Sequence, residues 1–386
     1  MARKLTIKEK VLQQAKKDKK KALKHSVILL VITGLLTFVT PFIFKTNAIE
    51  VNDDSDTVLT ASFVGDIMLG RHVEAITERY GQEYLFRHVK SLLQSSDYVS
   101  GNFEHPIVLQ DDYEKADKYI HLHTSGESAE TLKKMNFSVL TIANNHTMDF
   151  GESGLKDTID TFKKVGLAYV GAGKNLKEAS KINYQKINGI VVASIGITDS
   201  YVKDAVALDK RAGVLPANPE IILPIINKAQ STADLVIVNI HWGQEYDNDP
   251  SPRQKQLAKA MAKAGADIII GHHPHVLSTV EIHGDSIIFY SLGNFIFDQG
   301  WSRTKDSVIV HYKLYEDGTG RFELIPLRIK EASPSPVGAL GTFYKKRIFS
   351  YLTKDTSHEM WKEEDGKLIV ELDHSHVLKG ATSNGK

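Results

Sequence analysis

Apolar positions along this chain fall into two kinds of run. Short apolar runs, typical of buried strands, are separated by longer segments that have apolar residues at helical spacing. The strand-like runs cover residues 58–64, 137–143, 168–170, 190–195, 235–240, 266–270 and 286–291. The helix-like segments cover 75–94, 154–165, 221–229 and 252–264, the third with Pro224 inside it. Strands that alternate with helices predict an α/β layered fold for residues 58–305.

The pattern changes near residue 306. Residues 308–315 and 321–329 flank Asp317-Gly318 and predict a β-hairpin. The last fifty residues predict one short helix and a second hairpin around Asp365-Gly366. We see no catalytic pattern in this part, so residues 306–386 are expected to form a small β-rich accessory region packed on the main domain.

The N-terminal segment has a third pattern. Residues 26–44 carry no charge and are mostly apolar, and their length approaches what a helix needs to cross a bilayer. Residues 1–25 before them are strongly basic. This arrangement predicts an uncleaved signal anchor of a single-pass cell-membrane protein, with residues 1–25 in the cytoplasm and the main domain extracytoplasmic. Residues 45–57 would be a linker. A cleaved signal peptide is the closest alternative, but Thr46-Asn47-Ala48 is a poor cleavage site.

Charge and composition narrow the choice of partners. The chain has 386 residues, no cysteine and a net charge of +1. A disulfide framework and thiolate metal sites are therefore excluded. Residues 1–24 hold ten Lys or Arg against two carboxylates, so the remainder is mildly acidic, at about −7. Anionic lipid would attract the basic tail, but we favour a solvated topology signal over a specific lipid site. An acidic body makes nucleic acid an unsuitable partner and predicts no broad basic groove.

Polar side chains follow the strand-like runs where each one ends. Five strand ends carry side chains able to bind a metal: Asp66, Asn145 with His146, His241, the group His272, His273 and His275, and Asn294. A sixth candidate is Asn102-Phe103-Glu104-His105, after residues 96–100. Parallel strands bring their carboxyl ends to one edge of a sheet. Each residue alone has a structural alternative, such as a helix cap, a left-handed turn or a buried core histidine. Together they favour a site of nitrogen and oxygen ligands that suits Mn, Fe, Zn or Mg.

The motifs at these strand ends resemble those of a known family. They are GDIMLGR (65–71), NFEHP (102–106), ANNHTMDFG (143–151), HWGQEY (241–246), GHHPHV (271–276) and YSLGNFIFD (290–298). The set is similar to the CapA-type poly-γ-glutamate capsule biosynthesis proteins of the calcineurin-like metallophosphoesterase superfamily, over roughly residues 58–300. The resemblance implies a layered calcineurin-like α/β sandwich. It also implies partners: the poly-γ-glutamate polymer and the membrane-bound subunits that synthesise and export it.

The resemblance also implies roles for individual residues. Glu104 would bridge two divalent ions, with Asn145, His241 and His273 on one ion and Asp66 and His275 on the other. His146 would act near the substrate as a general acid or charge stabiliser, and His272 would support a ligand. Whether one or two ions bind is left open.

One position departs from the superfamily pattern. Where that pattern has Asp-x-His, this chain has Asp66-Ile67-Met68, and a thioether suits a hard dinuclear site poorly. Arg71 and His72 lie close by in sequence and could compensate, which makes Arg71 a second catalytic candidate. His121 and His123 have ligand-like spacing but are expected at the site wall or the surface.

Three functions are compatible with these observations. The first is a membrane-anchored accessory factor for poly-γ-glutamate synthesis, export or attachment, with a metal site. The second is an active metal-dependent hydrolase of a phosphoester or of the γ-linked polymer. The third is a non-catalytic polymer-binding scaffold.

Overall fold

The computed structural model describes residues 3, 5–43, 49, 55–202 and 204–382, in two units. The first unit contains helix α1 (Ile7–Ile43). Among the helices described, none combines the length and the apolar character that crossing a membrane requires. Residues 36–44 of the expected anchor lie outside the part of the chain whose side chains are described, as does most of the linker that follows.

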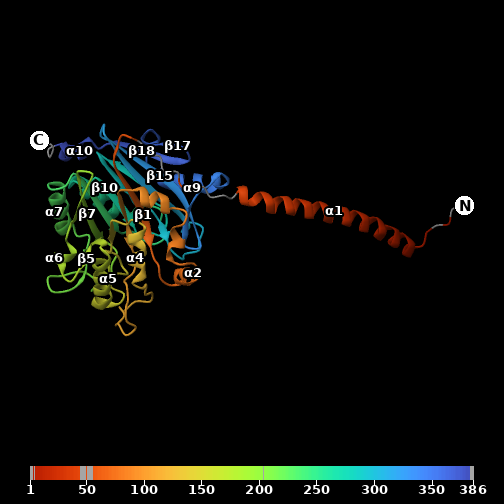
Figure 1. Cartoon of the computed structure of the whole chain (residues 1–386), viewed down its shortest axis with the longest axis horizontal. Coiled ribbons are helices and arrows are strands. Elements are labelled where there is room, and N and C mark those ends of the chain that lie inside the picture. Colours follow the sequence, from red (N-terminus) through yellow and green to blue (C-terminus); the bar gives the residue numbers. More distant parts are fainter. Residues whose placement is uncertain (1–2, 4, 44–48, 50–54, 203, 383–386) are drawn as a thin grey trace. The chain divides into compact units, whose positions relative to one another are not determined.

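The second unit is built on two β-sheets (Figure 1). The first sheet has a long run of paired strands, β17 (Lys362–Glu364), β18 (Lys367–Asp373), β15 (Thr319–Lys330), β14 (Asp306–Tyr315), β1 (Thr57–Ile67), β2 (Tyr98–Phe103), β3 (Val139–Thr141) and β4 (Ala168–Val170). Off this run, β13 (Asn294–Ile296) pairs with β1 and β16 (Ser333–Pro336) with β15. The second sheet runs β11 (Val280–His283), β12 (Ser286–Phe289), β10 (Ile268–His272), β9 (Leu235–His241), β7 (Ile190–Thr198) and β6 (Asn183–Ile187). Strands β5 (Ala172–Gly173) and β8 (Gly213–Val214) form a small ribbon.

Three hydrophobic clusters show how the layers stack. On β9, Leu235 and Ile237 belong to the cluster that also holds Phe63 of β1, so this cluster lies between the two sheets. The alternate residues of β9 join a cluster with α7 (Pro219–Gln230) and α8 (Pro252–Lys263) on the outer face. A third cluster joins the other face of the first sheet to α2 (His72–Tyr80), α3 (Lys90–Ser95), α4 (Glu127–Lys134) and α5 (Gly151–Val165). The order helix, sheet, sheet, helix confirms the predicted α/β fold class.

Most predicted elements are present, with one clear error. The helix expected over 75–94 is wrong: it is broken into α2, the 3-10 helix η1 (Gln82–Phe86) and α3. The break falls at Gly81, whose φ of 79° lies outside the helical region. The strands β6 and β11 and helices α4, α6 (Leu176–Ala179) and α10 (Ser375–Thr382) were not expected. Pro224 stays inside α7.

Residues 306–386 form the predicted β-rich structure, and they also complete the first sheet. Strand β14 pairs with β1 between Thr57 and Phe63, and β15, β18 and β17 follow outward. Helix α9 (Thr342–Leu352) packs Ile348, Phe349 and Leu352 into the cluster between the sheets. The region expected to be an accessory therefore supplies one half of a sheet whose other half carries the candidate ligands.

Strand register brings the candidate ligands to one edge of the molecule. In the first sheet Asp66 lies level with Asn102 of β2 and Asn294 of β13. In the second sheet His241 lies level with His272. The close pairing of β1 and β13 depends on Gly65, because a Cβ there would collide with the backbone of Gly293. The carboxyl ends of parallel strands from both sheets thus converge.

Candidate metal centre

Two buried carboxylates form the middle of this edge. Asp66, near the end of β1, accepts hydrogen bonds from the Asn102 side-chain amide (2.8 Å) and the backbone N–H of His273 (3.2 Å). Glu104 follows β2 directly and is fully buried, yet neither of its carboxylate oxygens has a hydrogen-bond partner among the described residues. Burial raises the pKa of Glu104 well above its usual range. Burial also opposes ionisation of Asp66, but hydrogen bonds and charge from His272 and His275 hold its pKa well below the usual range.

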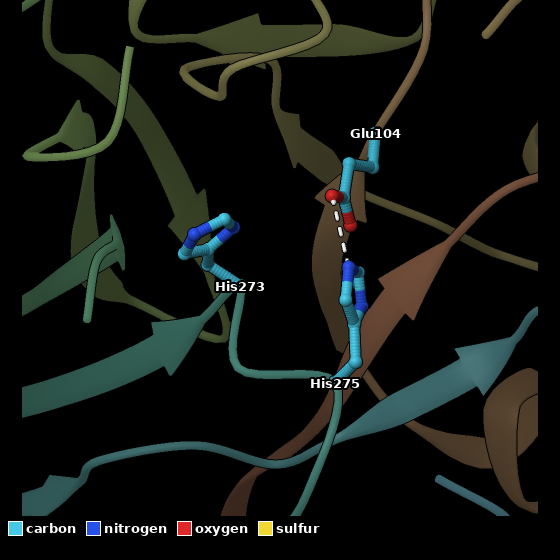
Figure 2. A group of neighbouring side chains, drawn as sticks. All are labelled: Glu104, His273 and His275. Atoms are coloured by element: carbon cyan, nitrogen blue, oxygen red, sulfur yellow. Dashed lines mark ion pairs between the residues drawn. The ribbon is translucent and has the colours of Figure 1, made fainter. Parts of the chain in front are cut away.

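Three histidines surround Glu104, two of them drawn with it in Figure 2. The His275 ring turns its Nε2 toward Glu104, 3.6 Å from Oε1, with its Nδ1 3.3 Å from Asp66 Oδ2. The ring of His273 lies beside this pair. The Nε2 atom of His241 is 3.9 Å from Glu104 Oε1 and 3.0 Å from Asn145 Oδ1. The six predicted ligands therefore lie in one cluster.

The donor atoms of this cluster fit a metal ion. Two groups of three residues each place one ligand atom per residue within 4.8 Å of the others: Glu104 with His273 and His275, and Asp66 with Glu104 and His241. Glu104 belongs to both groups, as a bridging ligand would. Its two unpartnered oxygens and the unpartnered Nδ1 of His273 are atoms that a cation would satisfy. Nitrogen and oxygen donors of this kind suit Zn, Mn or Fe. The division of ligands between two ions stays a prediction.

Protonation of the histidines agrees with this fit. Burial lowers the pKa of His273 to about 3 and that of His241 well below its usual range, so both are neutral at pH 7, as metal ligands must be. His275 differs: burial opposes its charge, but Glu104 and Asp66 raise its pKa to about 9. A divalent ion bound between His275, Glu104 and Asp66 would supply the positive charge that the proton on His275 otherwise provides.

The backbone that carries the last two histidines is strained. His273 and His275 have φ values of 96° and 56°, in the positive-φ region of backbone conformation that residues other than glycine rarely adopt. Strained residues of this kind persist where the surrounding structure enforces them, most often at functional sites. The turn is held by Pro274, whose carbonyl accepts the backbone N–H of Tyr246 at 2.8 Å.

A second polar group lies next to the ligands and contains two residues that sequence reasoning missed. His146 Nδ1 is 2.7 Å from Asp149 Oδ2. Lys118 forms an ion pair with Asp149 and places its Nζ 3.0 Å from His146 Nδ1 and 2.9 Å from the carbonyl oxygen of Asn145. The spacing of His146 and Asp149 in the turn before α5 was a signal for that pair. Lys118 lies 28 residues earlier, and only the tertiary structure reveals it.

Asn102 connects the two ligand groups. Its side-chain nitrogen lies 2.8 Å from Asp66 Oδ1 and 3.2 Å from His241 Nδ1, and its oxygen accepts a hydrogen bond from Asn144. Asn294 plays a similar part for His275, with Oδ1 2.9 Å from Nδ1. His272 Nδ1 lies 3.5 Å from Asp66 Oδ1. Such partners orient metal ligands and tune their basicity.

The residues around the first motif lie in different surroundings. Met68 is fully buried and belongs to the hydrophobic cluster beneath the first sheet. Arg71 is bound to Asp298 by two hydrogen bonds, and its guanidinium lies 5.7 Å from the centre of the Phe297 ring. His72 is exposed at the start of α2.

The remaining candidate pair lies on the loop that carries Lys118. His121 Nε2 is 2.7 Å from the carbonyl oxygen of Ala116, and the His123 ring packs edge-on against Phe150. Neither residue belongs to the ligand groups among the described residues.

Comparison with known proteins identifies the class to which this arrangement belongs. Residues 60–299 match the family described as bacterial capsule synthesis protein PGA_cap. The match covers the second sheet, most of the ligand-bearing half of the first sheet and all the candidate ligands. The chain belongs to this family, as the motif resemblance predicted.

Two relatives match almost the whole chain. One is the PGA biosynthesis protein CapA of Bacillus subtilis, 52% identical over 98% of this chain and 100% of its own length. The other is the capsule biosynthesis protein CapA of Bacillus anthracis, 49% identical over 98% of this chain and 94% of its own. A probable polyglutamine synthesis accessory protein of Mycobacterium tuberculosis is 26% identical over 62% of this chain and 75% of its own. A hypothetical protein of Thermus thermophilus with a solved structure has a TM-score of 0.41 at 12% identity, and covers 72% of this chain and 96% of its own.

Proposed function

We propose that this protein is a membrane-anchored, extracytoplasmic component of poly-γ-glutamate capsule biosynthesis and export, with a divalent metal centre. The family and the two near-full-length relatives, whose names refer to PGA or capsule biosynthesis, support the capsule role. The unpartnered, fully buried Glu104 carboxylate between His241 and His275 is the observation that carries the metal centre.

The anchor is residues 26–44, with the basic residues 1–25 on the cytoplasmic side. The absence of charge in the first segment and the charge bias of the second support this orientation. Residues 58–386 would then work outside the membrane, beside the membrane-bound synthase and export subunits, where the polymer emerges.

The metal would be Mn, Fe, Zn or Mg, as one ion or two. Glu104, Asp66, His241, His273, His275 and Asn145 would hold it. When bound, such ions polarise a phosphoryl or carbonyl oxygen and lower the pKa of a bound water. Burial keeps the ligands out of bulk water, and Asn102 and Asn294 fix their orientation.

A polyanionic chain would meet this centre mainly through the metal. Three arginines already have partners: Arg71 is bound to Asp298, Arg253 to Asp199 at 2.6 Å and Arg303 to Asn248 at 2.8 Å. These partners neutralise or occupy the three guanidinium groups, so these arginines give no support to a pure polymer scaffold.

A hydrolase is the second candidate function, and the group of His146, Asp149 and Lys118 favours it. Asp149 engages Nδ1 of His146, which leaves Nε2 as the atom that can exchange a proton with a substrate. Lys118 places a positive charge beside the backbone carbonyl of Asn145, whose side chain is a candidate ligand. A metal with a purely structural role would not need the group of His146, Asp149 and Lys118 beside it.

The test uses two systems. The first is the full chain purified in detergent, and the second is a capsule-forming strain from which the gene for this protein has been deleted. Bound metal is measured, and hydrolysis of a generic phosphodiester and of poly-γ-glutamate is assayed with Mn²⁺ or Zn²⁺. Glu104→Gln and His241→Ala are compared with Glu323→Gln, which alters a buried carboxylate paired with Lys367. We expect both site variants, and not the control, to lose metal and capsule.

The outcomes separate the candidates. Turnover that disappears in both site variants supports the hydrolase. Capsule loss without any turnover in the wild type supports the accessory role. Metal-free protein that still restores the capsule would overturn the metal centre.

A further inference from the structure

An exposed tryptophan lies at the rim of the candidate metal centre. Trp301, on the loop between β13 and β14, is 65% exposed. Its indole stacks on the Tyr246 ring, with ring centres 5.3 Å apart and an angle of 17° between the planes. The Tyr246 ring lies in turn 6.3 Å from the ring of the candidate ligand His275. We call Trp301 and Tyr246 the aromatic shelf.

The fold holds Tyr246 beside the ligands in a strained conformation. Its φ of 66° lies in the positive range, which a bulky side chain rarely adopts. Its hydroxyl accepts a hydrogen bond from the Gln299 side-chain amide at 3.2 Å. Gln299 in turn accepts a hydrogen bond at 3.0 Å from Asn294, the residue that contacts His275. Strain that the surroundings enforce at such a place indicates a function for the ring.

Charge does not explain the aromatic shelf. Arg303, on the same loop as the indole, is bound to the Asn248 side-chain oxygen at 2.8 Å. Glu245 and Asp247, on either side of Tyr246 in the chain, are exposed carboxylates. A ligand would therefore contact the aromatic shelf through uncharged groups, which can pack on the faces of the two rings.

A γ-linked glutamyl chain offers such groups. Its backbone alternates planar amides with methylene segments, and each unit carries its α-carboxylate to the side. An α-linked glutamyl chain has the same charge for each unit, but it keeps its methylene groups in the side chains. Stacked aromatic rings that accept an apolar, planar backbone would distinguish these two polymers, whereas a cationic groove would not.

We propose that the aromatic shelf binds the methylene and amide backbone of a γ-linked glutamyl chain beside the metal centre. The inference rests on the proposed role in poly-γ-glutamate biosynthesis, and it names the residues of this centre that would hold the polymer. Bound on Trp301 and Tyr246, a segment of the chain would lie next to the ring of His275.

Tryptophan fluorescence provides a direct test on the full chain in detergent. In the Trp361→Phe protein the only other tryptophan besides Trp301 is Trp242, which is fully buried. The exposed Trp301 should therefore respond most to a ligand. γ-Linked polyglutamate should change the emission at concentrations about fivefold or more below those required of α-linked polyglutamate of equal length.

Variants measure what the indole contributes. Anisotropy of a fluorescein-labelled γ-linked oligomer gives the dissociation constant. Trp301→Ala should raise this constant about tenfold, and Trp301→Phe, which keeps an aromatic face, should raise it less. Tyr184→Ala removes an exposed aromatic from β6, at the edge of the second sheet, and should leave it unchanged. Bound metal should stay at the wild-type level in all three variants.

Complementation of the deleted strain reports the proposed function separately. If Trp301→Ala binds the γ-linked oligomer as tightly as the wild type does, or if the wild type binds both polymers equally, the aromatic shelf is overturned. A capsule restored by the wild type then leaves the proposed function standing. Binding of a chitin oligomer in place of the γ-linked chain also overturns the inference, in favour of a glycan. A wild type that neither restores the capsule nor binds the γ-linked chain overturns both.

Discussion

The two halves of the first sheet differ in whether their buried carboxylates have cationic partners. In the antiparallel half, Asp306 accepts hydrogen bonds from Arg328 at 2.5 Å and from Arg347 at 2.7 Å, and Glu323 is paired with Lys367. In the parallel half, the equally buried Glu104 lies near His241, His275 and Asp66, and its carboxylate has no hydrogen-bond partner among the described residues. In a buried ion pair, removing either partner is costly because the other charge is left buried and unpaired. A buried carboxylate without partners costs stability unless a cation binds there.

The largest effect that this comparison predicts is on metal binding. Glu104→Gln removes the shared ligand, so the affinity for Zn²⁺ or Mn²⁺ should fall by more than the roughly 100-fold that loss of a ligand's supporting partner can cost. The metal-free variant should be at least as stable as the wild type, because it no longer buries an unpartnered carboxyl. Calorimetric titration and thermal melts with and without metal measure both. Wild-type affinity in this variant would remove Glu104 from the site.

In the antiparallel half, the matching substitution, Asp306→Asn, should lower stability and leave metal binding nearly unchanged. Asp306→Asn leaves Arg328 and Arg347 without their carboxylate, and the free energy of unfolding should fall by about 3 kcal/mol. Metal affinity should change far less than in Glu104→Gln. Chemical denaturation of the metal-free proteins provides the first value and titration the second. An unchanged unfolding midpoint would contradict the structural role assigned to this ion pair.

In the antiparallel half, a buried histidine, His311, should make the free energy of unfolding depend on pH. Burial lowers the pKa of His311, which lies 3.1 Å from the Ser62 hydroxyl, to about 4. Between pH 6.5 and 4 the unfolded chain binds a proton at this histidine that the folded protein does not. The contribution of this group to the free energy of unfolding is therefore fully present above pH 6.5 and falls by about 3 kcal/mol as the pH drops toward 4.

The matched variant for that effect is His311→Gln. Its metal-free unfolding free energy, followed by denaturant titration at several pH values, should decline less steeply between pH 6.5 and 4 than that of the wild type. Parallel pH curves for the two proteins would show that another group causes the loss.

The smallest expected effect concerns Met68. Because it packs among apolar side chains, Met68→Leu preserves volume and should cost less than about 1.5 kcal/mol. Metal affinity should stay at the wild-type level. A clear loss of metal in Met68→Leu, measured beside the same titration of Glu104→Gln, would make the thioether a ligand after all.

The sequence was most informative where strand ends carry polar residues. Apolar runs located β1, β9 and β10, and Asp66, His241 and His273 follow from where those runs stop. It was least informative where local pattern is ambiguous. The apolar spacing over 75–94 predicts one helix, whereas Gly81 breaks it, and a single glycine is a weak signal in sequence.

Contacts between residues far apart in the chain could not be predicted from the sequence, because local pattern carries no information about them. Lys118 lies on a loop with no periodic pattern, and its approach to Asp149 depends on how that loop folds back. Asn102 was visible as a strand-end residue, but its position between Asp66 and His241 depends on the packing of two sheets.

The α/β class and the candidate ligands can be read from the sequence, because strand periodicity and the polar residues at strand ends are local properties; the family follows from the resemblance of the motifs. Three facts emerge only from the folded chain: Glu104 is buried without a hydrogen-bond partner among the described residues, Met68 lies in the core, and residues 306–386 complete the ligand-bearing sheet. These facts depend on register between strands and on the packing of one sheet against another, which join residues far apart in the chain.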